Sequence, residues 1–286
     1  MAATVKEAFV ELSRRLEVTD PQASTMSTRQ QNVRAAMERG FQVLDSFLGG
    51  SYARSTMIGP LDEADIDIFV ILDPKYFRSH TPAALLNETR DVVRKTYPAT
   101  TGIRPDGQAV TIPFADFKVD VVPCFNRQGG GYLIPDSSAG AWVSTNPDAH
   151  ATLLTTRNKA HAGDLVPLIK MIKGWNRTHG GRFVGFYLEL LTGAILENVT
   201  ISDLASGVRY VFDKGREKVK FKQRDPADYG GQVNGLARGT VDEAVQSFAS
   251  AYNSAVRAEA HASTGNVRAA IAEWKALFGD YFPAYG

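Results

Sequence analysis

Apolar and polar positions alternate with two different periods along the chain. Residues 4–17 carry apolar side chains at helical spacing, and a second helix is expected from Asp20, as N-cap before Pro21, up to Gly49-Gly50. Residues 65–72 and 117–122 are short runs rich in β-branched residues, which predict buried strands, and 82–97 predicts a helix between them. Helices followed by mixed strands, without a repeated βαβ unit, indicate an α+β fold.

From about Asn146 the pattern becomes helical and stays so to the end. The chain is therefore expected to divide into a mixed domain, 1–145, and a helical domain, 146–286. Asp164 is the predicted cap of a helix that carries two lysines, Lys170 and Lys173. A basic stretch at 214–224 favours an exposed edge strand, with a local docking surface as the alternative.

The two predicted strands carry carboxylates in otherwise apolar surroundings. Asp65 and Asp67 are two residues apart, so both side chains leave the same face of their strand, and Asp120 lies in the middle of the other strand. Carboxylates gathered in this way repel one another, and a divalent cation relieves the repulsion. Hard oxygen ligands suit Mg²⁺, with Mn²⁺ as an alternative.

Each of these features also has an ordinary explanation. A D-x-D sequence is often a surface pair, Gly49-Gly50-Ser51 can be a simple turn, and Asp120 could cap a hairpin. Their order along the chain nevertheless favours a two-metal phosphoryl-transfer centre in which the glycine turn and Ser51 receive a phosphate.

This order of motifs resembles the DNA-polymerase-β-like nucleotidyltransferase superfamily. Within it, the chain is similar to the bacterial cyclic-oligonucleotide synthases of the CD-NTase group, relatives of animal oligoadenylate synthetase and cyclic GMP–AMP synthase. The segments 168–176 and 186–191 are similar to the lysine-bearing helix and the L-E-L-L helix of oligoadenylate synthetase, and Asp225-Pro226 with Gly230-Gly231 is a weaker match. The resemblance spans about residues 45 to 280 and implies a polymerase-β-like core followed by a helical lobe.

The resemblance also implies roles for single residues. Asp65 and Asp67 would hold the metal on the donor triphosphate, and Asp67 and Asp120 would share a second one, with Asp120 nearest the acceptor hydroxyl. Gly50 and Ser51 would grip the terminal phosphates. The nucleotide-binding residues expected in the helical part are Lys170 and Lys173 for the phosphates, Tyr187 for base stacking and Asn158 for uracil recognition. For Asn158, capping of a turn is an equally good alternative.

Charge and cysteine content limit the partners. Lys plus Arg (32) nearly balances Asp plus Glu (31), so no global basic field is available and no DNA or RNA activator is expected. The single cysteine, Cys124, excludes a cysteine-rich zinc site like that of the animal DNA sensor. The sequence shows neither an apolar run of membrane-spanning length nor a signal peptide, so we expect a cytoplasmic protein without membrane partners.

Taken together, the resemblance implies a Mg²⁺-dependent synthase that joins nucleoside triphosphates, UTP or ATP or both, into a cyclic di- or oligonucleotide. It also implies a role in antiphage (CBASS-type) signalling, where an effector protein senses the product. Three alternatives stay open: a nucleotidyltransferase that modifies tRNA, protein or a small molecule, a linear oligoadenylate synthetase, and an inert nucleotide-binding scaffold.

Overall fold

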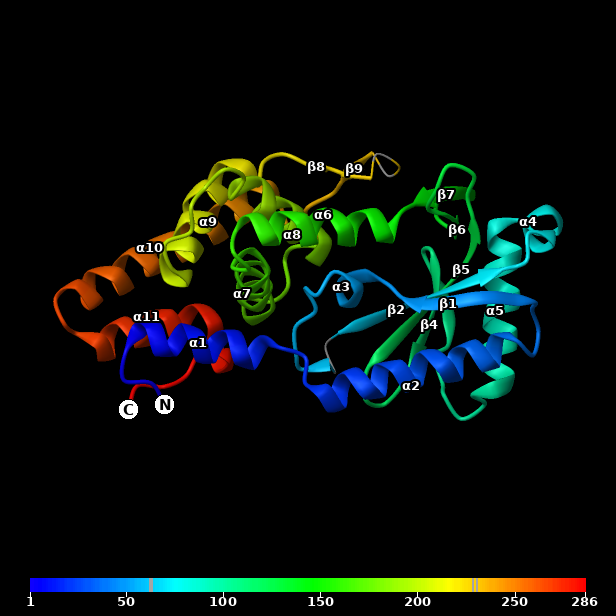
Figure 1. Ribbon diagram of the computed structural model, residues 1–286, viewed down its shortest axis with the longest axis horizontal. Coiled ribbons are helices and arrows are strands. Elements are labelled where there is room, and N and C mark those ends of the chain that lie inside the picture. The colour runs from blue at the N-terminus through cyan, green and yellow to red at the C-terminus, as the bar shows by residue number, and fades with distance from the viewer. Residues whose placement is uncertain (62–63, 228, 230) are drawn as a thin grey trace. The chain divides into compact units, whose positions relative to one another are not determined.

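A seven-stranded mixed sheet and a set of packed helices form the two units of the computed structural model, which describes residues 1–61, 64–227, 229 and 231–286. The sheet unit comprises Val18–Leu153 and Asp225–Gly231, and the helical unit comprises Met1–Glu17, Leu154–Arg224 and Gln232–Gly286. The α+β fold class is therefore as predicted (Figure 1). Gly230, from the Asp225-Pro226 motif, lies outside the described residues.

The sheet joins the two predicted strands side by side. Its main path runs β1-β2-β5-β4-β3, and β6 pairs with β5 and β7. The strands are β1 (Val43–Leu48), β2 (Asp65–Leu72), β3 (Arg104–Asp106), β4 (Ala109–Pro113), β5 (Lys118–Asn126), β6 (Tyr132–Asp136) and β7 (Ala141–Thr145). Only β2 and β5 run parallel among these pairs. Strand β5 continues through Pro123, where the sequence predicted its end.

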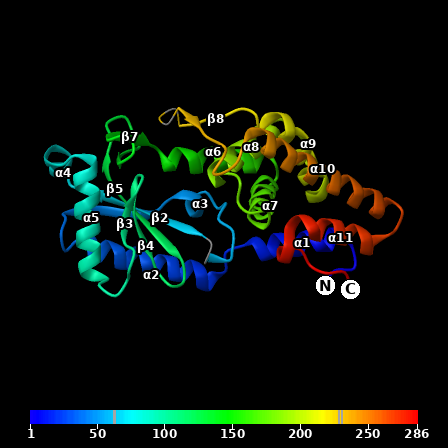
Figure 2. The ribbon, with the colours of Figure 1, turned by 180° about the vertical axis from the view of Figure 1, so that it is seen from behind.

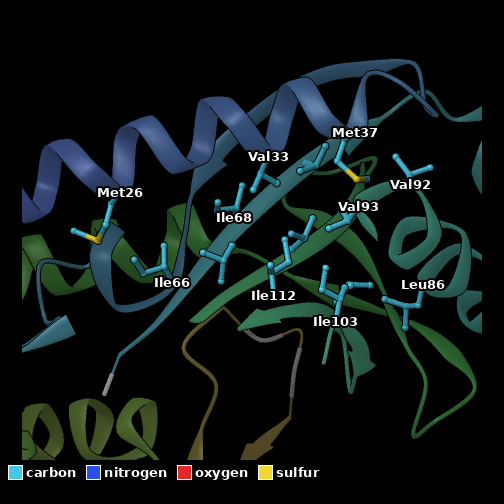
Figure 3. Close-up of a cluster of buried hydrophobic side chains, with 14 of the residues drawn as sticks. Met26, Val33, Met37, Ile66, Ile68, Leu86, Val92, Val93, Ile103 and Ile112 are labelled. Atoms are coloured by element: carbon cyan, nitrogen blue, oxygen red, sulfur yellow. The ribbon is translucent and has the colours of Figure 1, made fainter. Parts of the chain in front are cut away.

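One face of the sheet is covered by α2 (Asp20–Met37) and α5 (Pro82–Thr96). Figure 3 shows Met26 and Val33 of α2 directed toward Ile66 and Ile68 of β2, and Met37 of α2 directed toward Val93 of α5. Alternate residues of β2 and β5 point into this core, so the residues between them, including all three aspartates, belong to the opposite face. Two short helices, α3 (Gly50–Ala53) and α4 (Lys75–Ser79), complete this part of the unit.

The predicted helix from Asp20 to Gly49 is wrong in its second half. Helix α2 ends at Met37, and strand β1 follows from Val43. Between them Gly40 lies so close to the Val92 side chain of α5 that a Cβ atom would overlap it. The helix also begins one residue earlier than expected, since Thr19, not Asp20, is the N-cap of a capping box with Gln22.

The helical unit packs six helices around an aromatic core, seen from behind in Figure 2. Its helices are α1 (Val5–Leu16), α7 (Leu165–Thr178), α8 (Gly185–Ile195), α9 (Leu204–Lys218), α10 (Val241–Ser263) and α11 (Val267–Phe278), followed by a 3-10 turn (Gly279–Tyr281). The ring of Trp175 lies 5.0 Å from those of Phe212 and Phe248, centroid to centroid. The basic stretch 214–224 begins as the end of α9, which reaches Lys218, so the favoured edge-strand interpretation was wrong. Only Gln223–Arg224 at its end forms a strand, β8, paired with β9 (Gln232–Val233).

The observed division differs from the predicted boundary at residue 145 in two respects. Helix α1 belongs to the helical unit, because Phe9 packs edge-on against Trp274 at 4.9 Å and Leu16 lies against Gly174. The later crossing falls inside α6 (Pro147–Ala160), after Leu153. Within the described ranges, none of the helices combines the length and apolar character that crossing a membrane requires.

Candidate active site

The strand register places the three aspartates next to one another. Asp67 of β2 is paired directly with Asp120 of the parallel strand β5, and Asp65 lies two residues before Asp67. Ile66 and Val119, which alternate with them, are buried in the core on the other face. The predicted grouping of Asp65, Asp67 and Asp120 on one face is therefore present in the backbone. The parallel pairing of β2 with β5 is what brings these residues together.

The glycine turn lies against Asp67. The N–H of Gly49 donates to the carbonyl oxygen of Asp67 at 2.8 Å. Gly50 has a φ of +56°, in the left-handed region, and a Cβ atom there would overlap the Asp67 carboxylate. Only glycine allows the backbone to approach this carboxylate so closely. The turn thus belongs to the same site as the aspartates.

Ser51 follows as part of α3. Its carbonyl oxygen accepts hydrogen bonds from the N–H groups of Thr56 at 2.9 Å and Met57 at 3.0 Å, which fixes the loop after α3. The Ser51 side chain is half-buried. Ser51 thus follows directly in the chain on Gly50, the residue that lies against Asp67.

The electrostatics of Asp120 are those of a carboxylate held in unfavourable surroundings. Burial raises the pKa of the Asp120 carboxyl above its usual range, and the negative charges of Asp65 and Asp106 raise this pKa further. In the opposite direction, Thr111 Oγ1 donates a hydrogen bond of 2.6 Å to Asp120 Oδ1, and this contact lowers the pKa. Lys118, 3.9 Å from Asp65 Oδ1, also lowers it. A cation at this face would relieve the repulsion.

The donor set fits a hard divalent cation in residue type and backbone placement. Neighbouring strands lie roughly 4.8 Å apart, so carboxylates on paired residues lie within reach of a common ion. In the side-chain positions of the described residues, however, no three His, Cys, Asp or Glu groups are close enough to hold a metal ion. The register of the two strands thus brings the three aspartates together as predicted, but their carboxylate oxygens do not converge on one point.

The two lysines of α7 are both engaged in ion pairs. Lys170 is 6% exposed, and its Nζ lies 2.5 Å from Glu17 Oε2. Its predicted phosphate contact is therefore replaced by a link between α1 and α7. Lys173 Nζ lies 3.2 Å from Glu189 Oε1, whose side chain is buried. The L-E-L-L segment thus supplies the partner of Lys173.

Tyr187 and Asn158 make contacts of a structural kind. The Tyr187 side chain is buried, and its hydroxyl donates to the carbonyl oxygen of Phe221 at 2.8 Å, so the predicted stacking on a base does not agree with its position. The Asn158 side-chain oxygen accepts from the N–H of Val166 at 3.0 Å in the first turn of α7. This is the capping alternative of the sequence analysis, and Asp164, the predicted cap, makes no side-chain cap bond.

Two polar contacts in the sheet unit were missed from the sequence. Thr111 reaches Asp120 through the pairing of β4 with β5, which no local pattern encodes. His150 Nε2 lies 2.6 Å from Asp225 Oδ1, with both residues buried, and this pair links Asp225 to α6. The Asp225-Pro226 motif identified one partner of this pair, whereas spacing gave no sign of the histidine 75 residues earlier.

Comparison with known proteins adds a family. The model of the Second Messenger Oligonucleotide or Dinucleotide Synthetase domain matches residues 3–158, more than half of the chain. A cyclic AMP-AMP-AMP synthase from an Acinetobacter strain is 25% identical over 299 aligned residues, which cover 98% of this chain and 86% of that protein.

Solved structures share the fold. The cyclic AMP-GMP synthase DncV of Vibrio cholerae, in complex with the linear intermediate pppA(3′,5′)pG, superposes with a TM-score of 0.80 at 12% identity, covering 99% of this chain and 98% of that one. CdnC of Escherichia coli MS115-1, solved in complex with a HORMA protein, gives a TM-score of 0.73 at 17% identity, with 98% of both chains covered.

Proposed function

The chain belongs to the second messenger oligonucleotide or dinucleotide synthetase family, and we propose that it joins nucleoside triphosphates and closes the product into a ring. The observation that carries this proposal is the register of β2 and β5, which sets Asp67 beside Asp120 with Asp65 on the same face. The glycine turn against Asp67 supports it, because it offers close-packed backbone to the triphosphate of the same substrate.

In the proposed reaction, an acceptor ribose hydroxyl oxygen forms a bond to the α-phosphorus of a donor triphosphate. The bond between that phosphorus and the leaving pyrophosphate breaks, and the hydroxyl proton passes to Asp120 or to water. Asp65, Asp67 and Asp120 would hold Mg²⁺, or Mn²⁺ in its place, which supplies charge neutralisation at the transferred phosphoryl group.

The proposed phosphate-binding residues are chosen from the contacts of the glycine turn and of the two lysines of α7. Gly50 lies against Asp67, and Gly50 with the next residue, Ser51, would receive the terminal phosphates. Lys173, which is paired with Glu189, is the better candidate of the two lysines, since Lys170 is buried against Glu17. Neither Tyr187 nor Lys170 is retained in the proposed nucleotide site.

ATP is the proposed substrate, because the chain is similar to a cyclic AMP-AMP-AMP synthase. Use of UTP stays a prediction that depends on Asn158, and the bond from Val166 to the Asn158 side-chain oxygen speaks for the capping role. We further propose antiphage signalling through an effector that senses the product, as the CD-NTase resemblance implies. A protein regulator would agree with the HORMA complex of the Escherichia coli relative.

The test is product synthesis from labelled ATP, GTP, CTP and UTP with Mg²⁺, without DNA or RNA. Phosphatase treatment and chromatography follow. A phosphatase-resistant product supports ring closure, whereas a phosphatase-sensitive ladder would identify a linear synthetase. The double variant Asp65→Asn/Asp67→Asn should lose synthesis by more than about 100-fold, because the charges that hold the metal are gone.

A matched control distinguishes loss of the metal-binding residues from the mere loss of a negative charge on the same sheet. Asp45→Asn removes an exposed carboxylate from β1 of the same sheet, where Asp45 is paired with Arg34, and should leave synthesis within about 2-fold of the wild type. Near wild-type synthesis by the Asp65/Asp67 double variant would end the proposal. Product that forms only after duplex DNA or RNA is added would contradict the expectation of an enzyme without a nucleic-acid activator.

A further inference from the structure

Strand β4 contributes one polar side chain to the carboxylate face of the sheet. Thr111 is the register partner of Asp120 in the antiparallel pair of β4 and β5. Its neighbours Val110 and Ile112 point into the core, so Thr111 shares its face of β4 with Ala109 and Pro113. Of these three residues only Thr111 can donate a hydrogen bond from its side chain.

The hydrogen bond from Thr111 is short and protected. Thr111 Oγ1 lies 2.6 Å from Asp120 Oδ1, and Thr111 is 6% exposed. Within the described part of the chain, no second hydrogen bond to the Asp120 carboxylate is formed. The orientation of this carboxylate therefore depends on a single neutral donor.

We propose that Thr111 is a positioning residue that fixes the carboxylate plane of Asp120 for metal binding, an inference that rests on the function proposed above. The terminal torsion of an aspartate is broad, so without the bond the carboxylate can rotate over a wide range. With Oδ1 committed to Thr111, Oδ2 is the oxygen left for the cation. Asp120 would then act as a ligand through one oxygen, with its second oxygen oriented by the neighbouring strand.

A purely structural role makes a different prediction. If Thr111 only satisfies a half-buried carboxylate, its removal should lower thermal stability and leave metal affinity and turnover unchanged. If it orients Asp120, loss of the hydroxyl should weaken metal binding and turnover together, and serine should restore both. Outer-shell partners of metal ligands typically matter by about 10- to 100-fold in affinity or activity.

The experiment compares Thr111→Val, which keeps the shape of the side chain, with Thr111→Ser, which keeps the hydroxyl. Thr89→Val is the matched control, because Thr89 is a fully buried threonine of α5 whose hydroxyl makes no hydrogen bond to the residues described here. Binding of Mn²⁺ to the full chain is followed by electron paramagnetic resonance of the free ion, in parallel with kcat and KM for ATP.

We expect Thr111→Val to weaken Mn²⁺ binding and lower kcat by about 10- to 100-fold with KM changed less than about 3-fold. Thr111→Ser and Thr89→Val should stay within about 3-fold of the wild type. The proposal is overturned if Thr111→Val binds Mn²⁺ and turns over like the wild type, or if Thr111→Ser is as impaired as Thr111→Val. Asp120→Asn is measured alongside: if that variant keeps full activity, the proposed function itself fails, independently of Thr111.

Discussion

Gly50 offers a direct test of the turn against Asp67. In Gly50→Ala the new Cβ atom would lie 2.8 Å from Asp67 Cγ and would overlap Oδ2, so the carboxylate has to rotate away. The substitution also places alanine at a φ of +56°, which costs about 1–2 kcal/mol. A reduced unfolded-state entropy offsets about 0.4–1 kcal/mol of that cost. An off-rotamer aspartate adds about 0.5–1.5 kcal/mol.

The variant Gly107→Ala is the control that separates the cost of the backbone conformation from the effect of displacing the Asp67 carboxylate. Gly107 has nearly the same φ, +57°, and lies in the turn between β3 and β4, where a Cβ atom would meet no heavy atom within 4 Å. Gly107→Ala should therefore lose roughly 0–1.5 kcal/mol of unfolding free energy and keep its activity. Gly50→Ala should lose about 1–3 kcal/mol and more than about 100-fold in kcat, because Asp67 is the proposed ligand shared by both metals.

Two measurements decide the outcome. Urea unfolding of the metal-free proteins gives the free energies, and synthesis at saturating ATP and Mg²⁺ gives kcat. If Gly50→Ala keeps more than about a third of wild-type turnover, the close approach to Asp67 has no catalytic meaning and the reasoning fails. Equal losses of activity in the two alanine variants would also refute it, since backbone strain alone would then explain both.

Three further predictions concern single side chains. Lys173→Gln, which can still donate to Glu189, should raise KM for ATP by about 10-fold or more. Lys170→Met should change KM for ATP by less than about 2-fold. The reverse order of effects would identify Lys170 as the phosphate ligand. Asn158→Ala should lower the unfolding free energy by about 1 kcal/mol and leave the product profile unchanged, and a shift of more than about 5-fold in UTP incorporation would instead indicate base recognition. Because the pKa of Asp120 is raised in the folded state, its ionisation costs stability as the pH rises through that pKa, and the cost is absent below the unfolded pKa of about 3.9. Asp120→Asn should therefore raise the melting temperature of the metal-free protein at pH 7 and have little effect near pH 3.5, and an equal shift at both pH values would contradict this linkage.

The aspartates could be predicted from the sequence because their signal is local. A strand pattern with polar residues at alternate positions defines a face within eight residues, and the order of the motifs supplied the resemblance. The end of α2 was missed for the same reason, since Phe41, Leu44 and Leu48 continue the helical spacing although they lie beyond the helix and in or before β1. Here the packing of Gly40 against α5 outweighs the local period.

Contacts between distant residues explain the other errors. Lys170 meets Glu17 across 153 residues, and the hydroxyl of Tyr187 meets a carbonyl oxygen 34 residues away. In the sequence both residues carry the type expected of a nucleotide site, and only their partners show that they support the fold. Thr111 is the reverse case. Its residue type does not suggest a place in the site, and only the register of β4 against β5 sets it beside Asp120.

The two ion pairs of α7 differ in which member is buried, and this difference is the basis for proposing different roles for the two lysines. In the Lys170 pair the lysine side chain is 7% exposed and Glu17 is 49% exposed, so the carboxylate is hydrated and the ammonium depends on it. In the Lys173 pair Glu189 is 3% exposed, and the ammonium compensates the charge of its buried carboxylate. An ammonium has three donors, so the bond to Glu189 does not by itself prevent donation to a phosphate oxygen. Lys170 would have to leave its buried position to do so, and we therefore propose Lys173 rather than Lys170 for the phosphate contact.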